Sequence, residues 1–319
     1  MLIPDEWLLE ARKRITPYIQ QTPISYDSQL EAYLKWENQQ ITGSFKARGA
    51  LNKILAMPQW ERERGIVTAS AGNHAAAVAF ACSLVNAKVE IFIPSSTPKV
   101  KVERIQKFGS QIHFVEGTYG ATEQAAIEYA KNKEAVYISP YNDGQVIAGQ
   151  ATLAIEFLEQ LHGEEIKAVI VPVGGGGLIS GVGEVLKSRQ FYPDDALPLL
   201  IGVQSEASPY MHNLYHFGNQ DNITEWNSIA DGLSGAVEPH SITIPIVKKH
   251  VDEFILVSEE DIQEAIRYAW ITHNQVLEGS AATSIAAVLT GKIKIHPALL
   301  ILTGQNIQPD VHREIIEGD

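Results

Sequence analysis

Four consecutive glycines lie between an apolar run and a helical pattern, in the segment VIVPVGGGGLISGVGEVL. Glycine adopts positive φ easily and lets the backbone approach a ligand closely, so successive N–H groups can point at one anion. The N-terminal end of the helix that follows adds positive potential. No Gly-Lys-Ser/Thr follows, as in a P-loop, and no acidic residue ends the next apolar run, as in a dinucleotide site. The segment therefore predicts a site for a single phosphate group, held by Gly174, Gly175, Gly176 and Gly177.

A lysine suited to covalent chemistry lies in a second segment, SFKARGALNKIL, where Lys46 follows Phe45. A lysine that forms an imine must be neutral for part of the time. Partial burial beside an aromatic ring lowers the pKa of the amine toward that condition. Most lysines are solvated surface charges, but this one belongs to a chain that also carries a monophosphate loop. The combination favours imine chemistry.

These two segments need a scaffold, and the chain from Gly65 onward predicts one. Short apolar runs rich in β-branched residues alternate with longer helical patterns such as NHAAAVAFACSLV and GQATLAIEFLEQL. Strands that are apolar on both faces, each followed by a helix, are typical of parallel sheets covered by helices. The runs are many for one small sheet, so we expect two α/β units. The predicted strands are residues 65–69, 88–94, 111–117, 135–139, 167–173, 197–204, 252–258 and 297–304.

The composition of the chain limits its partners. The 319 residues include 25 basic and 38 acidic ones, a formal net charge of −13. An acidic surface repels nucleic-acid phosphates and anionic lipids, so we expect neither nucleic-acid nor membrane partners. No stretch has the apolar pattern of a signal peptide or of a bilayer-spanning segment, and Cys82 is the single cysteine. We expect a cytoplasmic protein in which Cys82 is a small buried side chain.

The ordered motifs resemble those of the fold-type II pyridoxal-phosphate (PLP) enzymes, in the branch of threonine/serine dehydratases and serine racemases. The resemblance covers nearly the whole chain, and several ordered motifs are far more specific than any one alone. The matching segments are Ser44-Phe45-Lys46 for the Schiff-base lysine, Ser70-Ala71-Gly72-Asn73-His74 for the substrate-carboxylate loop, the four glycines with Leu178 for the phosphate loop, and Thr303-Gly304 for the pair at the pyridine nitrogen. Weaker matches occur at Tyr141, Asp231-Gly232 and Glu278.

The resemblance implies a role for each motif. It implies that Lys46 is the Schiff-base lysine and also the base that removes the Cα proton, and that Asn73 hydrogen-bonds the 3′-oxygen of the cofactor. The residues that it places around PLP are Phe45, Lys46, Asn73, Gly174, Gly175, Gly176, Gly177, Leu178, Glu278 and Thr303. The residues that it places around the substrate are Ser70, Ala71, Gly72, Asn73, His74, Tyr141 and Gly232. The residue types alone leave His74 open as a core histidine and Glu278 as a solvated charge at a helix end.

The resemblance also implies a fold of two open, twisted, mostly parallel sheets flanked by helices. Residues 1–64 and 143–319 would form a large PLP-binding domain. Residues 65–142 would form a small domain that carries the substrate-carboxylate loop and closes on the substrate. PLP would lie between the domains, at the carboxyl ends of the strands. Relatives of this kind suggest a homodimer.

The implied reaction is β-elimination from a small hydroxy amino acid, L-threonine and/or L-serine, to a 2-oxo acid and ammonia. An aspartate at the pyridine nitrogen would keep that nitrogen protonated and stabilise a full carbanion. The neutral hydroxyl of Thr303 does not, which favours prompt elimination and hence a lyase.

Four other functions remain as alternatives. A serine racemase needs an acid–base group on each face of Cα, and the serine that serves the second face in racemases is replaced here by Ala71. The others are a 3-hydroxyaspartate dehydratase, a PLP-binding protein without turnover, and a nucleotide-binding protein with a similar glycine loop.

Two further features of the family bear on this chain. Several relatives bind a divalent cation through a glutamate, a backbone carbonyl and an aspartate. Glu206 matches the glutamate, but His212 stands where the aspartate is expected, so a site for Mg²⁺ or Ca²⁺ is left open. The chain runs to Asp319, shortly after Thr303, so we expect no C-terminal regulatory domain that binds an amino-acid effector.

Overall fold

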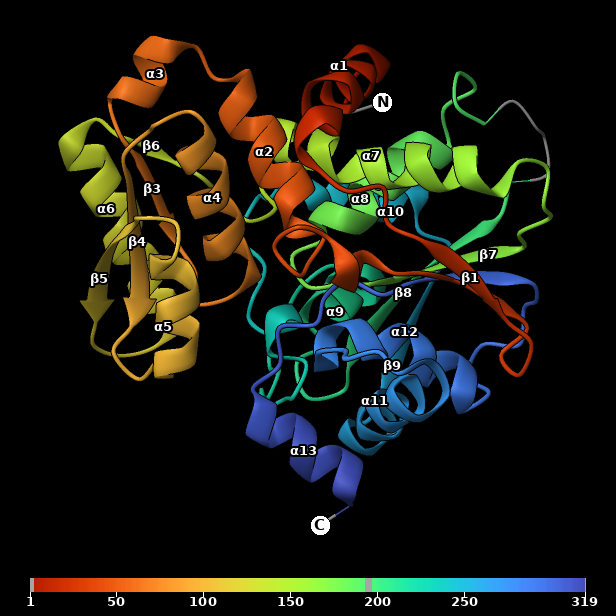
Figure 1. Cartoon of the computed structure of the whole chain (residues 1–319). Coiled ribbons are helices and arrows are strands. Elements are labelled where there is room, and N and C mark those ends of the chain that lie inside the picture. The colour runs from red at the N-terminus through yellow and green to blue at the C-terminus, as the bar shows by residue number, and fades with distance from the viewer. Residues whose placement is uncertain (1–2, 193–196, 319) are drawn as a thin grey trace.

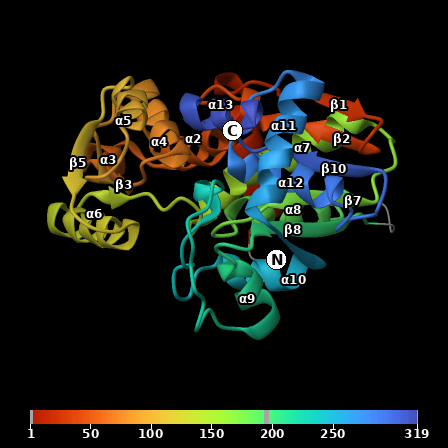
Figure 2. The same ribbon diagram turned by 90° about the horizontal axis from the view of Figure 1, so that it is seen from below.

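The computed structural model describes residues 3–192 and 197–318. Two α/β lobes lie side by side, each built on a mostly parallel sheet with helices on both faces (Figures 1 and 2). The predicted fold class, two open and mostly parallel sheets flanked by helices, is confirmed.

The larger lobe contains a six-stranded sheet. β1 runs antiparallel to β2, and the other neighbouring strands are parallel. In order across the sheet, the strands are β1 (Ile24–Asp27), β2 (Ala32–Lys35), β10 (Ala298–Ile301), β7 (Ala168–Pro172), β8 (Leu199–Ser205) and β9 (Glu253–Val257).

Helices cover both faces of this sheet (Figure 1). On one face lie α1 (Asp5–Ile15), α7 (Gly144–Leu161), α8 (Gly177–Leu186), α9 (Tyr210–Phe217) and α10 (Thr243–His250). On the other face lie α11 (Glu259–His273), α12 (Gly279–Leu289) and α13 (Pro309–Glu317). Val169 and Val171 of β7 are buried in the first core, and Ala168 and Ile170 in the second. This alternation explains why the strand is apolar at successive positions.

The smaller lobe contains a four-stranded parallel sheet. Its strands are, in order, β5 (Gln111–Val115), β4 (Val89–Pro94), β3 (Ile66–Ala69) and β6 (Val136–Tyr137). Its helices are α3 (Gln59–Glu63), α4 (Asn73–Leu84), α5 (Lys99–Gln106) and α6 (Tyr119–Lys133). α2 (Lys46–Ala56) packs against both α7 of the larger lobe and α4 of the smaller one, so it joins the two lobes. Three short 3₁₀ turns complete the chain, at Thr16–Tyr18, Glu37–Gln39 and Asp231–Leu233.

Each of the eight predicted strands overlaps an observed strand, but the hairpin of β1 and β2 was not predicted. β1 lies at the edge of the sheet and is half-exposed, so its residues lack the apolar run that marks the buried strands. None of the described helices is long and apolar enough to cross a membrane.

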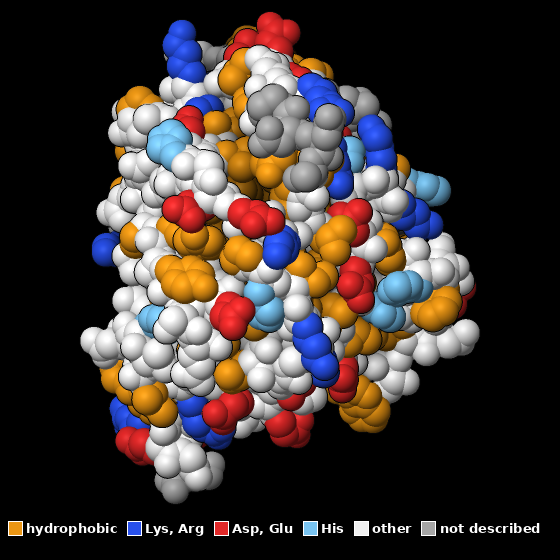
Figure 3. Space-filling model, turned by 90° about the vertical axis from the view of Figure 1, so that its right-hand side faces the viewer, with side chains coloured by type: hydrophobic (Ala, Val, Ile, Leu, Met, Phe, Trp, Pro, Cys, Tyr) orange, Lys and Arg blue, Asp and Glu red, His pale blue; other side chains and the backbone are white. Residues whose placement is uncertain are grey.

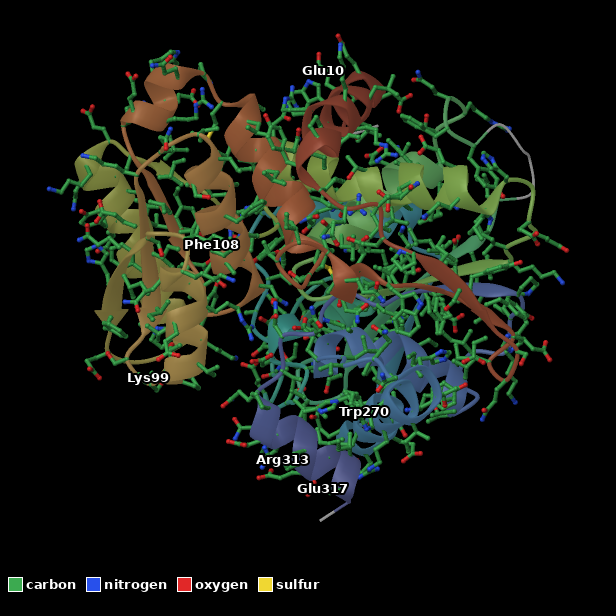
Figure 4. All side chains as sticks on the ribbon, in the orientation of Figure 1. Glu10, Lys99, Phe108, Trp270, Arg313 and Glu317 are labelled. Atoms are coloured by element: carbon green, nitrogen blue, oxygen red, sulfur yellow. The ribbon has the colours of Figure 1, made fainter. Side chains whose placement is uncertain are left out.

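Side chains in the smaller lobe confirm one prediction about the core. Cys82 on α4 is buried, and burial raises the pKa of its thiol to about 12, so it is an unreactive core residue. Phe108, labelled in Figure 4, packs edge-on against Phe80 of α4 with 5.6 Å between ring centroids.

Figure 3 shows the face of the larger lobe on the right of Figure 1, where acidic, basic and hydrophobic side chains are interspersed.

Candidate active site

The lysine segment and the segment after β10 lie side by side. The N–H of Phe45 donates to the carbonyl of Thr303 at 3.0 Å, and Ser44 pairs with Gly304 in an isolated antiparallel bridge. β10 ends at Ile301, so the residues that follow emerge at the carboxyl edge of the sheet. Open α/β sheets bind ligands at this edge. The fold therefore brings two predicted motifs that are distant in sequence into one region.

Lys46 is the first residue of α2 and is half-buried. Its Nζ lies 3.1 Å from the carbonyl oxygen of Pro140 and 5.2 Å from the centroid of the Phe45 ring. Burial lowers the pKa of the amine to about 8, although the charge of Glu278 opposes that shift. An amine with this pKa is partly unprotonated near neutral pH. Lys46 thus has the property that imine formation and proton abstraction require.

The glycine loop connects β7 to α8. Gly176 has a φ of +85° and forms the N-cap of α8, a conformation that favours glycine. An added Cβ at Gly175 would lie 2.4 Å from the ring of Tyr141, and one at Gly177 would lie 2.9 Å from the Cβ of Tyr141. The loop therefore has no room for side chains at these positions. Its N–H groups, at the start of a ten-residue helix, suit an anion.

The other predicted residues near the loop are close to it. Leu178, the second residue of α8, is buried in the core. The Tyr141 hydroxyl accepts a hydrogen bond from the N–H of Glu238 at 2.9 Å. An added Cβ at Gly174 would lie 3.4 Å from the carbonyl oxygen of Gly232, and the N–H of Gly232 donates to Ser280 Oγ at 3.1 Å.

The predicted substrate-carboxylate loop leads from β3 into α4. The N–H of Gly72 donates to Ser70 Oγ at 3.1 Å, which closes a local turn. Ala71 is half-buried and packs partly against the core of the smaller lobe. An added Cβ at Gly72 would meet none of the described atoms within 4 Å, so the start of α4 faces open space.

His74 forms part of the wall behind this loop. It is 3% exposed, and its Nε2 lies 3.1 Å from the carbonyl oxygen of Ile138. A carbonyl only accepts, so Nε2 carries the hydrogen. Burial, together with the charge of Lys46, lowers the pKa of His74 to about 3. The ring is therefore neutral, with Nε2 committed to the backbone.

Asn73 and Glu278 contact each other across the site. Asn73 Nδ2 donates to Glu278 Oε1 at 2.8 Å and to Oε2 at 3.0 Å. Glu278 forms the N-cap of α12 and is 7% exposed, so the alternative of a solvated helix-end charge is wrong. Burial raises the pKa of Glu278 to about 7, although the bond from Asn73 opposes the shift.

Sequence reasoning missed Asn306, which contacts both of these residues. Its N–H donates to Glu278 Oε2 at 3.1 Å, and its Nδ2 donates to Asn73 Oδ1 at 2.5 Å. The one available signal was its position, two residues after Gly304 in the motif at the end of β10.

Three buried hydroxyls of the site have no hydrogen-bond partner among residues 3–192 and 197–318, namely those of Thr42, Ser44 and Thr303. A buried hydroxyl left unpaired costs about 1–3 kcal/mol, so its presence calls for an explanation. A ring nitrogen that accepts from Thr303 supplies one. The amine of Lys46 suits an aldehyde, and the glycine loop suits a phosphate. These residues fit PLP.

A cavity of about 190 Å³ adjoins Glu278 and Asn306. Lys101 of α5 lines it and pairs with Asp231 at 2.7 Å. Because α5 belongs to the smaller lobe and Asp231 to the larger one, this ion pair joins the lobes beside the site. Arg104, one turn further along α5, is half-buried, and burial lowers its pKa against the attraction of Glu278.

The segment that holds a divalent cation in several relatives differs here. Lys292 Nζ lies 3.5 Å from Glu206 Oε1, 3.0 Å from Asp261 Oδ2 and 2.9 Å from the carbonyl oxygen of Leu256. The described part of the chain contains no group of three His, Cys, Asp or Glu side chains that could hold a metal ion. His212 Nδ1 lies 3.2 Å from Asn213 Oδ1. In this structure the amine of Lys292, and not a set of oxygen ligands, faces Glu206 and Asp261.

Known proteins resemble this chain along most of its length. Residues 10–304 match the family described as pyridoxal-phosphate dependent enzyme. An L-threonine ammonia-lyase of Thermotoga maritima is 37% identical over 99% of this chain and 78% of its own. A catabolic L-threonine dehydratase of Staphylococcus aureus is 38% identical over 89% of this chain and 82% of its own. The structure of maize serine racemase matches with a TM-score of 0.90 at 29% identity, over 100% of this chain and 98% of that one.

The family match spans both lobes and every residue predicted for the site, from Phe45 to Thr303. Since the amine, the glycine loop and the unpaired Thr303 hydroxyl also fit the cofactor, the chain belongs to the family of pyridoxal-phosphate dependent enzymes, with PLP as its cofactor.

Proposed function

We propose that this protein is a PLP-dependent ammonia-lyase that converts L-threonine and/or L-serine to a 2-oxo acid and ammonia. The observation that carries the proposal is the neutral, buried and unpaired hydroxyl of Thr303, which lies next to the lysine segment. A neutral group at the ring nitrogen favours rapid loss of the β-hydroxyl over long-lived carbanions. The two curated relatives described above act on L-threonine according to their names, and they match this chain over most of its length.

When bound, PLP supplies the electron-withdrawing ring that makes the Cα–H bond of an amino acid acidic. Lys46 would hold its aldehyde carbon and the glycine loop its phosphate. The amine of Lys46 would take the proton from Cα, which its pKa of about 8 permits near neutral pH. Thr303 and Asn73 would hold the ring in a fixed orientation.

The loop of residues 70–74 would bind the substrate carboxylate. The positive end of α4 and the Ser70 hydroxyl are suited to an anion, and open space lies at Gly72. His74 is neutral, so it contributes no charge to this contact. Fixing the carboxylate orients the Cα–H bond toward Lys46, which is the main contribution of this loop to the rate.

The experiment that tests the proposal is an assay of ammonia and 2-oxo acid release from L-threonine, L-serine, 3-hydroxyaspartate and their D-enantiomers. We expect turnover of L-threonine or L-serine by a yellow protein whose visible absorbance is bleached by borohydride. A bleachable protein that releases no 2-oxo acid from the whole panel would support the PLP-binding protein without turnover. A preference for 3-hydroxyaspartate would move the proposal to that substrate.

Serine racemase is the second candidate, because maize serine racemase matches the fold over 100% of this chain. Racemisation needs a proton donor on the face of Cα opposite Lys46, and Ala71 carries none. We expect wild-type protein to form little D-serine from L-serine, and Ala71→Ser to form measurably more, since general acid–base groups contribute about 10²–10⁴-fold. Chiral chromatography measures both. Wild-type formation of D-serine at a rate near that of pyruvate would reverse the preference.

We also propose that residues 65–142 act as a small domain that closes on the substrate, with residues 1–64 and 143–319 as the large domain. The pair between Lys101 and Asp231 joins the two across the site and supports this division. Closure would exclude water from the reacting atoms. Protection of the 70–74 loop from hydrogen exchange on addition of L-serine would test it.

A homodimer in the cytoplasm completes the proposal. α11 exposes Ile271 to 76%, next to Trp270, which is labelled in Figure 4. Trp270 packs edge-on against His312 of α13. Exposed apolar side chains of this kind are common at subunit contacts. The mass in solution, measured by light scattering, tests the dimer. A monomeric mass at micromolar concentration would contradict it.

A further inference from the structure

Asn306 lies between three segments of the site. Its Nδ2 donates to the carbonyl oxygen of Thr42 at 3.1 Å and to Asn73 Oδ1 at 2.5 Å, and its N–H donates to Glu278 Oε2 at 3.1 Å. It therefore connects the loop before Lys46, the start of α4 and the start of α12. These contacts determine which way the amide of Asn73 points.

The donor and acceptor of each hydrogen bond in this chain follow from one group, the backbone carbonyl of Thr42. A backbone carbonyl can only accept, so the Asn306 atom that faces Thr42 is the donor Nδ2. The same Nδ2 faces Asn73, and the atom that it meets there must accept, which makes it Oδ1. Asn73 consequently turns Nδ2 toward Glu278, where Oε1 and Oε2 accept from it. Each amide orientation follows from the carbonyl of Thr42.

The backbone on both sides permits this close approach. Gly43 has a φ of +75°, and an added Cβ there would lie 2.8 Å from Asn306 Oδ1. An added Cβ at Gly304 would lie 2.7 Å from Glu278 Oε1. A side chain at either glycine would push the amide or the carboxylate away. The tight packing holds Asn306 and Glu278 in place relative to Asn73.

We propose that Asn306 is a positioning residue: it fixes the amide of Asn73 so that an Asn73 N–H, and not its carbonyl oxygen, is presented to PLP. Both contacts of Asn73 Nδ2 run to one carboxylate, so one hydrogen serves both oxygens and the second is left for the cofactor. Without Asn306, the Asn73 amide can rotate and present Oδ1 to an anionic oxygen of the cofactor. This inference rests on PLP as the cofactor but not on the identity of the amino-acid substrate.

The test is a double-mutant cycle on PLP affinity, with Asn306→Ala, Asn73→Ala and the double variant. The dissociation constant for PLP is measured by equilibrium dialysis and by visible absorbance. We expect Asn306→Ala to weaken PLP binding by about tenfold, the value of one lost hydrogen bond near a charged group. If Asn306 acts through Asn73, the double variant binds PLP no more weakly than Asn73→Ala alone.

The matched control is Gln305→Ala, which truncates the exposed side chain of the preceding residue. Its PLP affinity should equal that of wild type. Melting of the cofactor-free proteins separates the proposed role from a loss of folding. A variant that folds poorly is replaced by Asn306→Ser in the same cycle.

Two results would overturn the proposal. One is a PLP affinity and absorbance maximum for Asn306→Ala equal to those of Gln305→Ala. The other is an additive loss in the double variant, which would mean that Asn306 acts independently of Asn73. A wild-type protein that binds PLP but releases no 2-oxo acid would count against the proposed function alone, because the cycle measures only cofactor binding.

Discussion

Two buried polar clusters each contain a residue from the start of α2. Arg48 points into an ion cluster between the sheet and α7, whereas Lys46, two residues earlier, points into the candidate active site. The ion cluster contains Lys35, Glu37, Arg48 and Glu156, whose side chains are all 0% exposed. Both clusters are buried. In the ion cluster the charged side chains contact charges of opposite sign, whereas in the site they contact neutral groups.

In the ion cluster, charges of opposite sign are matched. Arg48 contacts Glu37 at 2.7 Å and 2.8 Å and contacts Glu156 at 3.0 Å through two nitrogens. Lys35 Nζ contacts Glu156 at 2.7 Å. Burial opposes the ionisation of Glu156, but Arg48 and Lys35 together outweigh it and hold the pKa of that carboxyl below its usual range. Glu156 therefore remains ionised between Arg48 and Lys35.

In the site, charged groups are held by neutral ones. Lys46 bonds to a backbone carbonyl and Glu278 to an asparagine amide, and burial shifts the pKa of each toward neutrality, to about 8 and about 7. Groups that change protonation near neutral pH are those that can transfer protons. Burial alone therefore does not mark a functional residue here. Within these two clusters, the buried charged groups that lack a direct ion pair are those whose pKa lies near neutrality.

The largest expected effect comes from Lys46→Ala. Turnover should fall by about 10³-fold or more, because the base and the covalent anchor are both lost. The glycine loop should still bind PLP phosphate, and the melting temperature should change little. Lys99→Ala, at an exposed lysine of α5 labelled in Figure 4, is the control and should keep wild-type turnover. Substantial activity in purified Lys46→Ala would refute the assignment.

The next largest effect is on folding, from Arg48→Met. Removing one partner of a buried ion cluster leaves buried carboxylates unpaired and costs about 3–5 kcal/mol. The free energy of unfolding, from urea titration of the cofactor-free protein, measures the loss. Arg313→Met, at a residue 62% exposed and labelled in Figure 4, is the matched control and should change it by less than about 0.5 kcal/mol. A change in the free energy of unfolding as small for Arg48→Met as for Arg313→Met would mean that the ion cluster does not stabilise the fold.

Replacing one buried glutamate in each cluster should change the free energy of unfolding at pH 8 in opposite directions. The pKa of Glu278 is about 7 in the folded protein and about 4.3 when unfolded. Between these values the folded state binds more protons, so its stability falls as pH rises. Glu278→Gln removes that loss and should raise the stability of the cofactor-free protein at pH 8 by up to about 3 kcal/mol, and change it little at pH 4.

Glu156→Gln should do the reverse. The folded pKa of Glu156 is depressed, so its ionisation stabilises the fold above the unfolded pKa, and this contribution is lost as pH falls through the folded pKa. The variant should therefore be less stable than wild type at pH 8 and approach it in acid. Urea titrations across pH measure both variants, with exposed Glu317→Gln as the control. If both variants changed the free energy of unfolding at pH 8 in the same direction, the proposed difference between the clusters would be wrong.

The sequence predicted the site better than the ion cluster, for a physical reason. Lys46 and the glycine loop stand out together by residue type and spacing, and the family resemblance of the ordered motifs added Asn73 and Thr303. Arg48 and Glu156 are ordinary charged residues in helical segments, and only the packing of α2 against α7 buries them. A pattern of residue types does not show which charged side chains meet inside a core.

The same limit explains what was missed within the site and the fold. Asn306 owes its role to contacts with the carbonyl of Thr42 and the amide of Asn73, and neither contact has a sequence signature. The eight predicted strands were recognised from their apolar runs, although β5 and β6 are only partly buried, whereas the four-residue strands β1 and β2 were not predicted.

The smallest effect should come from two threonines that are almost fully buried but have different surroundings. Thr22 is 1% exposed, and its hydroxyl donates to Glu37 in the ion cluster. Thr303 is 2% exposed, and its hydroxyl has no partner within the described residues. Thr22→Val should destabilise the cofactor-free protein by about 1–3 kcal/mol, because a buried carboxylate loses a donor. Thr303→Val removes a hydroxyl that pairs with nothing in the fold, so the same urea titration should show no loss, or a gain of up to about 1 kcal/mol. For PLP affinity we expect the opposite order. Thr303→Val should bind the cofactor more weakly than Thr22→Val, because it lacks the hydroxyl that would donate to the ring nitrogen. Equal PLP affinities, or a loss of stability in cofactor-free Thr303→Val as large as that in Thr22→Val, would mean that the Thr303 hydroxyl serves the fold and not the cofactor.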